Sequence, residues 1–270
     1  MRRLALLFSA ICVALCAALV PAARAQAPQP PEEVDVALVL AVDISFSMDL
    51  DELALQRTGY VEALRSPEVM KAIQNGATGR IAVTYFEWAA FNLQHHLVPW
   101  TIIDGPAAAN AFADELQKQP VRRGQRTSIA GAIDYSVKIL DAAPVTAMRK
   151  VIDISGDGPN NSGRPVTTAR DEAVEKGIAI NGLPISIKRP GYLDITDLDA
   201  YYEDCVIGGR NAFVIPITDR AQFAQTIRTK LIMEISDADP GPSRLVRKVQ
   251  NRSRAHCMIG EEMFRNRMGN

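Results

Sequence analysis

The sequence predicts an α/β fold of three layers, in which a mostly parallel sheet is covered by helices on both faces. Three observations support this prediction. A valine-rich apolar run opens the folded region, strand-like and helix-like segments then alternate, and one very short link joins two strands as a hairpin. Alternating strands and helices form parallel sheets through right-handed crossovers. The hairpin adds one antiparallel strand, which we expect at the edge of the sheet.

The first predicted strand covers residues 34–42, a nearly unbroken apolar run that is typical of a strand buried on both faces. A helix is predicted next, because Asp49 stands three residues before Glu52 in a capping-box arrangement. An apolar stripe at helical spacing follows, made of Leu53, Tyr60, Val61 and Leu64.

Two strands are predicted in the next part of the chain, at residues 81–86 and 91–100. So few residues separate them that they should form an antiparallel hairpin. Helices at about 107–117 and 129–140 come next, and a strand at 150–155 follows them.

The last third of the folded region continues the alternation. A helix at 169–176 should end at Gly177, because glycine most easily adopts the left-handed cap conformation. Strands are predicted at 178–185 and 212–217, and a final helix begins at Asp219.

Residues 1–25 have the order of a secretory signal peptide, with two arginines, an apolar stretch at 4–20 and a small-residue cleavage pattern that ends at Ala25. The apolar stretch has 17 residues, near the lower limit for crossing a membrane, so an uncleaved anchor is the alternative. We expect cleavage near Ala25 and a periplasmic or secreted protein.

The rest of the chain divides by composition into a linker at 26–33, one domain at 34–236 and a basic tail at 237–270. The tail is interpreted as a solvated helix or a flexible arm, with contact to an anionic surface or partner as the alternative. Cleavage removes three arginines and no acid, so the formal charge falls from −1 to −4. This charge gives no reason to expect nucleic acid, and no transmembrane segment is expected after cleavage.

The four cysteines fall into two pairs. Cys12 and Cys16 lie in the signal peptide and leave with it. Cys205 and Cys257 remain, in a compartment where thiols are expected to be oxidised. A disulfide between these two and a pair of unpaired thiols are both compatible with the sequence.

Three loops carry oxygen-bearing side chains. The first holds Asp43, Ser45 and Ser47 after the first strand, the second holds Thr127 before a helix, and the third holds Asp157 between two glycines. Each has an ordinary alternative, since serine, threonine and aspartate are common in turns and at helix N-caps. In α/β sheets, however, ligands bind beyond the carboxyl ends of the strands. We therefore expect the three loops to converge on one ligand.

The chemistry of these side chains suits a magnesium ion. Two carboxylates neutralise a dication, and three hydroxyls supply hard neutral oxygens. An extended chain would hold the side chains of Asp43 and Ser47 about 13 Å apart, too far for one ion, so the strand must end by Asp43 and curl. Ser45 and Ser47 then face inward, and Phe46 points away.

The set resembles the metal-ion-dependent adhesion site (MIDAS) of von Willebrand factor A-type (vWA) domains. The pattern of that site is DxSxS, a distant threonine, and an aspartate in a glycine-containing loop. The resemblance covers about residues 34–235 and implies the Rossmann-like vWA fold. Two segments, at 154–163 with the run SGDGPNN and at 204–213 with Cys205, are similar to an uncharacterised family of exported bacterial vWA domains.

The resemblance also implies roles for the candidate ligands. The metal would be bound directly by the hydroxyls of Ser45, Ser47 and Thr127, and directly or through water by Asp43 and Asp157. Gly156 departs from the pattern, because many members carry threonine or serine before the aspartate. We expect this departure to affect the stiffness of the loop more than ligation.

In vWA domains the open metal position usually takes an acidic side chain of a partner. The expected function is therefore metal-dependent, adhesion-type protein binding, with magnesium as the ion and manganese or calcium as alternatives. An envelope assembly or chaperone factor that uses the same surface is a second hypothesis. An enzyme is not expected, because the chain has no GxSxG elbow and no phosphate loop. A metal-assisted hydrolase is the third hypothesis, and it lacks a visible base besides the ligand carboxylates.

Several other side chains could belong to a site. Adjacent His95 and His96 would point to opposite faces of a strand, and His256 has too few potential ligands nearby, so none is expected to bind a metal. Five residues could either lie near the metal edge or pack in the core: Glu87, Trp88, Tyr192, Tyr201 and Tyr202.

Overall fold

The computed structural model describes residues 30–188, 195–237 and 254–268. Within them, five strands form one sheet in the order β3-β2-β1-β4-β5. The strands are β1 (Glu32–Asp43), β2 (Ile81–Trp88), β3 (Gln94–Ile103), β4 (Val145–Gly156) and β5 (Ile178–Pro184). The α-helices are α1 (Leu50–Arg65), α2 (Pro67–Gln74), α3 (Pro106–Lys118), α4 (Ile129–Asp141), α5 (Val166–Glu175), α6 (Leu198–Tyr201), α7 (Phe223–Ser236) and α8 (Ile259–Met268).

The sheet is mostly parallel. Strand β1 pairs in parallel with β2 and β4, and β4 pairs in parallel with β5. Strand β3 runs antiparallel to β2 at the edge of the sheet. The predicted three-layer α/β fold with one antiparallel edge strand is therefore confirmed.

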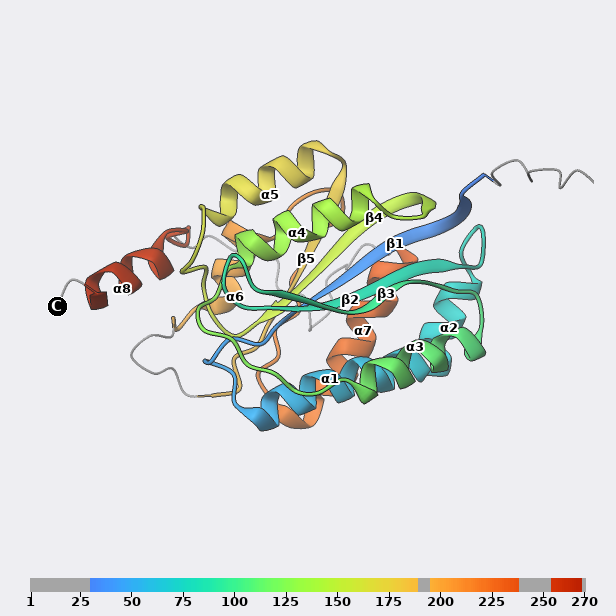
Figure 1. The fold of residues 1–270 in the computed structure, drawn as a ribbon, viewed down its shortest axis with the longest axis horizontal. Helices are drawn as coiled ribbons and strands as arrows, with labels where there is room; N and C mark the ends of the chain where they lie inside the picture. The colour runs from blue at the N-terminus through green and yellow to red at the C-terminus, as the bar shows by residue number, and fades with distance from the viewer. Residues whose placement is uncertain (1–29, 189–194, 238–253, 269–270) are drawn as a thin grey trace, which may run out of the picture. The chain divides into compact units, whose positions relative to one another are not determined.

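The two faces of β1 form two hydrophobic cores. Val36 and Leu38 pack with residues of α1, α2, α3 and α7 on one face. Ala37 and Val39 pack with residues of α4 and α5 on the other, and Figure 1 shows these two groups of helices on opposite sides of the sheet. Successive side chains of a strand point to opposite faces, so a strand with helices on both sides is apolar throughout. This explains the unbroken apolar run in the sequence.

Several local predictions are confirmed. The capping box at the start of α1 is present, because Asp49 accepts from the backbone N–H of Glu52 and Glu52 accepts from that of Asp49. Gly177 has a φ of 76°, the left-handed conformation expected after α5. Strand β1 begins at Glu32, two residues before its predicted start. Helix α2, which the sequence analysis did not identify, begins with Pro67 at its first turn.

The predicted strand at 212–217 is wrong. This segment contacts β5 through two isolated parallel bridges, Gly182 with Val214 and Ile185 with Ile217. Pro184 lies between the bridges and has no N–H to donate, so the ladder is interrupted there. The apolar residues of the segment are nevertheless buried, which accounts for the strand-like pattern.

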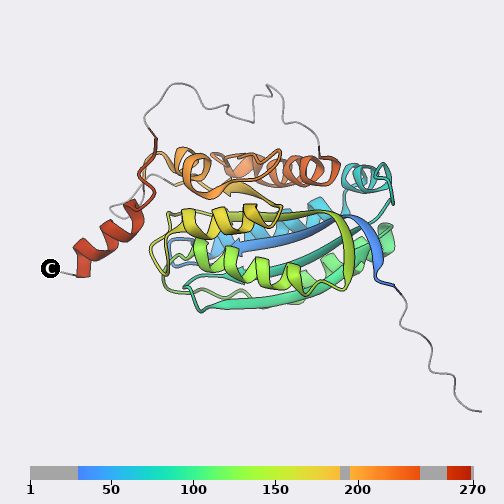
Figure 2. The ribbon, with the colours of Figure 1, turned by 90° about the horizontal axis from the view of Figure 1, so that it is seen from above.

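Residues 1–29 and 238–253 lie outside the described part of the chain, so the predicted signal peptide, half of the linker and part of the tail do too. Within the described residues, no helix is long and apolar enough to cross a membrane. The described part of the tail contains α8, and Cys257 just before it forms a disulfide with Cys205. Both views place α8 beyond the carboxyl ends of the strands (Figure 1, Figure 2).

Candidate metal centre

The candidate centre lies where the order of the strands reverses. Strand β1 has β2 on one side and β4 on the other, and the chain reaches β4 only after it has built β2 and β3. Loops that leave the carboxyl ends of β1 and β4 therefore diverge and leave a crevice between them. The first candidate loop follows β1 and the third follows β4.

The first loop leaves the strand at Asp43 and curls, as the sequence analysis predicted for a loop that holds metal ligands. Strand β1 ends at Asp43, and the backbone N–H of Ser45 turns back to donate to Asp43 Oδ1 at 2.7 Å. The hydroxyls of Ser45 and Ser47 lie 2.7 Å apart. Phe46, which stands between them in the sequence, has 54% of its surface exposed.

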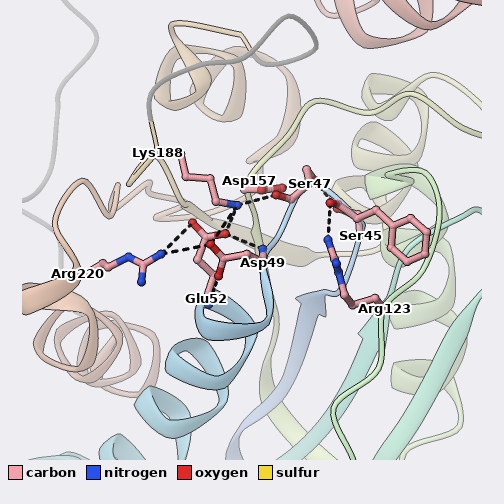
Figure 3. Close-up of polar contacts among 9 residues, drawn as sticks. Ser45, Ser47, Asp49, Glu52, Arg123, Asp157, Lys188 and Arg220 are labelled. Atoms are coloured by element: carbon pink, nitrogen blue, oxygen red, sulfur yellow. Dashed lines mark hydrogen bonds and ion pairs between the residues drawn. The ribbon is translucent and has the colours of Figure 1, made fainter.

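The third loop brings Asp157 to the first. Ser47 Oγ donates a hydrogen bond to Asp157 Oδ1 at 2.5 Å, as Figure 3 shows. Residues 110 positions apart in the sequence are thus in direct contact. The cause is the pairing of β1 with β4, which places Val42 beside Ser155 at the ends of the two strands.

The second loop is held between the other two. The backbone N–H of Gly124 donates to the carbonyl of Ile44 at 2.8 Å, which ties the loop to the first. Thr127 N–H donates to Asn161 Oδ1 at 2.9 Å, and Asn161 N–H donates to the Thr127 carbonyl at 2.8 Å, which ties it to the third. Thr127 then lines one cavity with Ser45 and Ser47.

The N-cap alternative for the second loop is also resolved. Ser128, the residue after Thr127, caps α4 by accepting from the backbone N–H of Gly131 at 3.1 Å. The Thr127 hydroxyl is not used for that cap. It lies 3.8 Å from the position that a Cβ on Gly158 would occupy, so it faces the third loop.

The oxygen atoms of the three loops fit a small divalent cation. Neighbouring ligands of an octahedral magnesium ion lie about 3 Å apart. The distances here are similar: 2.7 Å between the hydroxyl oxygens of Ser45 and Ser47, and 2.5 Å between Ser47 Oγ and Asp157 Oδ1. Asp43 Oδ2 is buried and, among the described residues, has no hydrogen-bond partner. A cation, or water bound to it, would satisfy this oxygen.

Burial, and next the charge of Asp157, raises the pKa of Asp43 well above its ordinary value. The charge of half-buried Asp157 therefore opposes the ionisation of buried Asp43. A dication would reverse this effect, because it favours the charged form of both.

Gly156 leaves room for two buried side chains. A Cβ at this position would lie 2.8 Å from Asp43 Oδ2 and 2.9 Å from Tyr202 Oη. The expectation that Gly156 mainly affects loop stiffness is thus incomplete. A threonine or serine side chain at this position would occupy the space of the Tyr202 hydroxyl.

The family of the chain follows from a match over most of its length. Residues 33–239 match DUF1194, described as a protein of unknown function. The chain belongs to the DUF1194 family. A search of curated proteins gives no match.

Solved structures show that this member of the DUF1194 family has the vWA fold. Proximal thread matrix protein 1 from the mussel byssus, with a zinc-occupied MIDAS motif, is 14% identical, with a TM-score of 0.55 over 76% of this chain and 49% of that one. A von Willebrand factor type A protein from Catenulispora acidiphila is 15% identical, with a TM-score of 0.53 over 75% and 43%. The vWF domain of the type V pili tip protein Mfa5 from Porphyromonas gingivalis is 11% identical, with a TM-score of 0.52 over 81% and 99%.

At these identities the likeness shows the fold alone. The match spans about half of the mussel protein and less than half of the Catenulispora protein. It confirms the resemblance to vWA domains on which the sequence analysis relied.

Two cations beside the centre were missed by the sequence analysis. Lys188 Nζ donates to the carbonyl of Ser47 at 2.6 Å and pairs with the buried carboxylate of Glu52. Arg220 pairs with Asp49 at 3.3 Å (Figure 3). Lys188 follows the predicted strand at 178–185, so its place at the same edge of the sheet could have been inferred. The capping box of α1 and the first loop are thus held by the same ammonium group.

The other candidate residues have structural roles. His96 Nε2 lies 2.6 Å from Thr84 Oγ1 on the neighbouring strand, and His256 Nδ1 lies 3.5 Å from Glu262 Oε2. Glu87 pairs with Arg57 in the interior. Three aromatic residues are buried in the core: Trp88, Tyr201 and Tyr202. Tyr192 lies outside the described residues. Within those residues, no group of three or more His, Cys, Asp or Glu could hold a metal ion, so a metal here would depend on the hydroxyls.

Proposed function

We propose that this chain is an exported vWA module that binds a divalent cation and, through it, an acidic side chain of a partner protein. The observation that carries this proposal is the contact of Ser45, Ser47 and Asp157 at the ends of β1 and β4. Asp43 and Thr127 complete the set. When bound, the cation would supply an open coordination position for a carboxylate oxygen.

Each ligand residue has a definite part in this proposal. The hydroxyls of Ser45, Ser47 and Thr127 bind the ion directly. Asp157 orients Ser47 by accepting a hydrogen bond from its hydroxyl, and Asp43 fixes the curl by accepting a hydrogen bond from the Ser45 N–H. Magnesium suits these hard oxygens, and manganese or calcium would be accepted by the same ligands with different spacing.

The proposal of export is supported by two features. Residues 1–25 have the signal-peptide order, and the Cys205–Cys257 disulfide is of a kind that persists in oxidising compartments. The similar fold of a pili tip protein from Porphyromonas gingivalis agrees with a place in the envelope or outside the cell.

The cation is tested by calorimetric titration of the chain with magnesium and manganese. Asp43→Asn keeps the shape of the side chain and an oxygen for the Ser45 N–H, and removes only the charge. We expect it to lower metal affinity at least tenfold, since a buried carboxylate facing a dication is worth more than about 1.4 kcal/mol. The matched control is Asp51→Asn, at an exposed position in the first turn of α1. Equal affinity in the two variants would refute the centre.

The partner is tested by crosslinking and pull-down from the native envelope, with and without chelator. Capture should require magnesium and should be lost in Asp43→Asn. A partner captured equally in excess chelator would show that binding does not pass through a cation.

The assembly-factor hypothesis remains a second candidate, because the described part of the tail lies beside the centre. Arg126 from the second loop stacks on Phe264 of α8. A chain that ends at Asp239 would lose the disulfide as well as the tail, so truncation does not separate the hypotheses. Charge reversal of exposed Arg254 or Arg265 leaves the disulfide in place. Only an assembly factor with a second contact on the tail should lose its complex in these variants.

We further propose that the chain binds and does not catalyse. Two cavities adjoin the centre, and neither is lined by a histidine or cysteine among the described residues. Glu52 and Lys188 line one of them, and they are engaged in an ion pair with each other. A metal-assisted hydrolase would need a base besides the ligand carboxylates. Screening generic phosphoesters with magnesium or manganese tests this, and turnover that disappears in Asp43→Asn would overturn it.

A further inference from the structure

A cavity of about 510 Å³ opens directly beside the candidate metal centre. Its lining includes Ser45, Ser47 and Thr127, and also Phe264 and Arg267 of α8. Part of the wall therefore comes from the far end of the chain, from a segment outside the residues matched by the family.

Helix α8 is attached firmly to the rest of the domain. The disulfide joins Cys257 to Cys205, and the backbone N–H of Ala255 donates to Asp204 Oδ2 at 2.6 Å. These contacts fix the chain immediately before the helix. The wall of the cavity is thus covalently linked to the domain.

The helix also contacts the loop that carries Asp157. Asn160 Nδ2 donates to Glu261 Oε1 at 2.7 Å, and a Cβ at Gly260 would come within 2.1 Å of the Asn160 carbonyl. Asn160 Oδ1 in turn accepts from the N–H of Ala130 in the first turn of α4. One buried asparagine of the SGDGPNN run therefore joins α8, the third loop and the first turn of α4.

Two guanidinium groups face this cavity, from Arg126 and Arg267. In the described part of the chain, neither forms an ion pair. Arg126 lies 3.5 Å over the ring of Phe264, which holds its guanidinium against α8 while its edge stays able to donate. Unpaired arginines beside an acidic centre would be expected to attract anions.

The backbone of Arg126 is in an unusual conformation. Its φ is 69°, in the left-handed region that residues other than glycine rarely adopt. Such conformations cost about 1–3 kcal/mol and persist where the surroundings impose them. Arg126 directly precedes Thr127, so this conformation aims the guanidinium and the ligand hydroxyl into the same cavity.

We propose that Arg126 and Arg267 form an anion subsite beside the cation, and that the partner segment is an acidic peptide with two carboxylates. The first carboxylate binds the cation, and the second binds the guanidiniums. This inference rests on the proposed function and specifies its partner. The planar guanidinium matches a carboxylate with two parallel hydrogen bonds. Exposed Phe46, which also lines the cavity, offers an apolar contact to the backbone between the two acids.

The test uses the chain with its disulfide intact and fluorescent pentapeptides in magnesium. One peptide carries a single glutamate, and the others carry two glutamates separated by none, one or two glycines. At least one of the two-glutamate peptides should bind about tenfold more tightly than the single-glutamate peptide, since a charge-assisted hydrogen bond contributes about tenfold in affinity. Arg126→Gly, which suits the positive φ, and Arg267→Ala should each remove most of this advantage and leave the affinity for the single-glutamate peptide unchanged.

The matched control is Arg254→Ala, which removes an arginine from the same segment outside the cavity and should keep the full advantage. Thermal melting checks that each variant is folded, and exposed Arg267 keeps the test valid if Arg126→Gly is unstable. Equal affinity for all peptides, or an advantage that survives both variants, would overturn the subsite.

Chelator separates this inference from the function on which it rests. If chelator abolishes binding of every peptide but the arginine variants have no effect, the metal-dependent function stands and the subsite is wrong. If the arginine variants weaken binding and chelator does not, the proposed function is wrong.

Discussion

Ser47 donates a hydrogen bond to Asp157 at 2.5 Å, although 110 positions separate them in the chain. The contact joins the loops after β1 and β4, at the edge where the strand order reverses. Asp43 lies beneath it with one buried oxygen that has no hydrogen-bond partner among the described residues. The charge of Asp157 opposes the ionisation of Asp43, and a bound dication would favour the charged form of both carboxylates.

Magnesium should therefore stabilise the folded chain. A ligand that binds only the native state at a hundred times its dissociation constant adds about 2.7 kcal/mol. Asp157→Asn should remove most of the shift in melting temperature that magnesium produces, and exposed Asp104→Asn should retain it. Thermal unfolding with and without magnesium measures both. Equal shifts in the two variants would exclude Asp157 from the centre.

Gly156→Ala should destabilise the domain by about 1–3 kcal/mol, because the added methyl group overlaps Asp43 and Tyr202. The matched control is Gly105→Ala, where a Cβ would meet nothing within 4 Å. Adding Tyr202→Phe to Gly156→Ala should recover part of the loss. The Tyr202 hydroxyl has no hydrogen-bond partner among the described residues, so its removal breaks no bond. Urea unfolding of the four proteins tests this, and no recovery would contradict the overlap.

Reduction of the disulfide should loosen α8 before it unfolds the sheet. The bridge closes a loop across 52 positions, which corresponds to about 4 kcal/mol of stability in the chain-entropy model. Hydrogen exchange at 259–268 should accelerate in reductant and in Cys257→Ser. The variant should show no further response to reductant. Unchanged exchange in α8 would mean that its other contacts hold it.

A buried charged cluster that the sequence analysis did not identify should govern stability near neutral pH. Lys230 Nζ lies 2.7 Å from Asp153 Oδ1 and also pairs with Glu234, one turn along α7. Asn181 Nδ2 donates to Glu234 Oε1 at 3.1 Å. Burial, and next the charge of Asp153, raises the pKa of Glu234 to about 7 from an ordinary value of 4.5.

The raised pKa sets the direction of the pH dependence. Between pH 4.5 and 7 the unfolded chain loses this proton while the native state keeps it. Glu234 therefore contributes stability at acidic pH that is lost as the pH rises through about 7, by up to about 3 kcal/mol. Glu234→Gln should flatten this decline in urea unfolding at pH 5 and pH 8, and exposed Glu175→Gln should not. If stability fell equally between pH 5 and pH 8 in wild type and in Glu234→Gln, the decline could not be assigned to Glu234.

Much of the fold could be predicted because local patterns agree with it. The run that became β1 is apolar on both faces, and Asp49 and Glu52 form their capping box within four residues. Such signals need no distant partner. The failed strand at 212–217 shows the limit, because the missing N–H that interrupts its ladder belongs to Pro184 on another segment.

The sequence could propose which residues lie near the candidate site, but not how they meet. Spacing singled out Asp43, Ser45 and Ser47, a helix start singled out Thr127, and a strand end singled out Asp157. The space that Gly156 leaves for Tyr202, and the contact of Lys188 with Ser47, depend on segments that the sequence does not connect. Side chains that meet through tertiary packing leave no periodic signal.

The sequence by itself determined the layers of this protein and the edge of the sheet where chemistry could occur, and it proposed five candidate oxygen ligands there, because hydrophobic period and strand ends are local properties. Only the tertiary structure decided that Cys205 pairs with Cys257 and that α8 forms a wall of the cavity beside the centre. The physical reason is that strand pairing and a disulfide bring together residues at arbitrary separations along the sequence, and such contacts leave no local pattern to recognise.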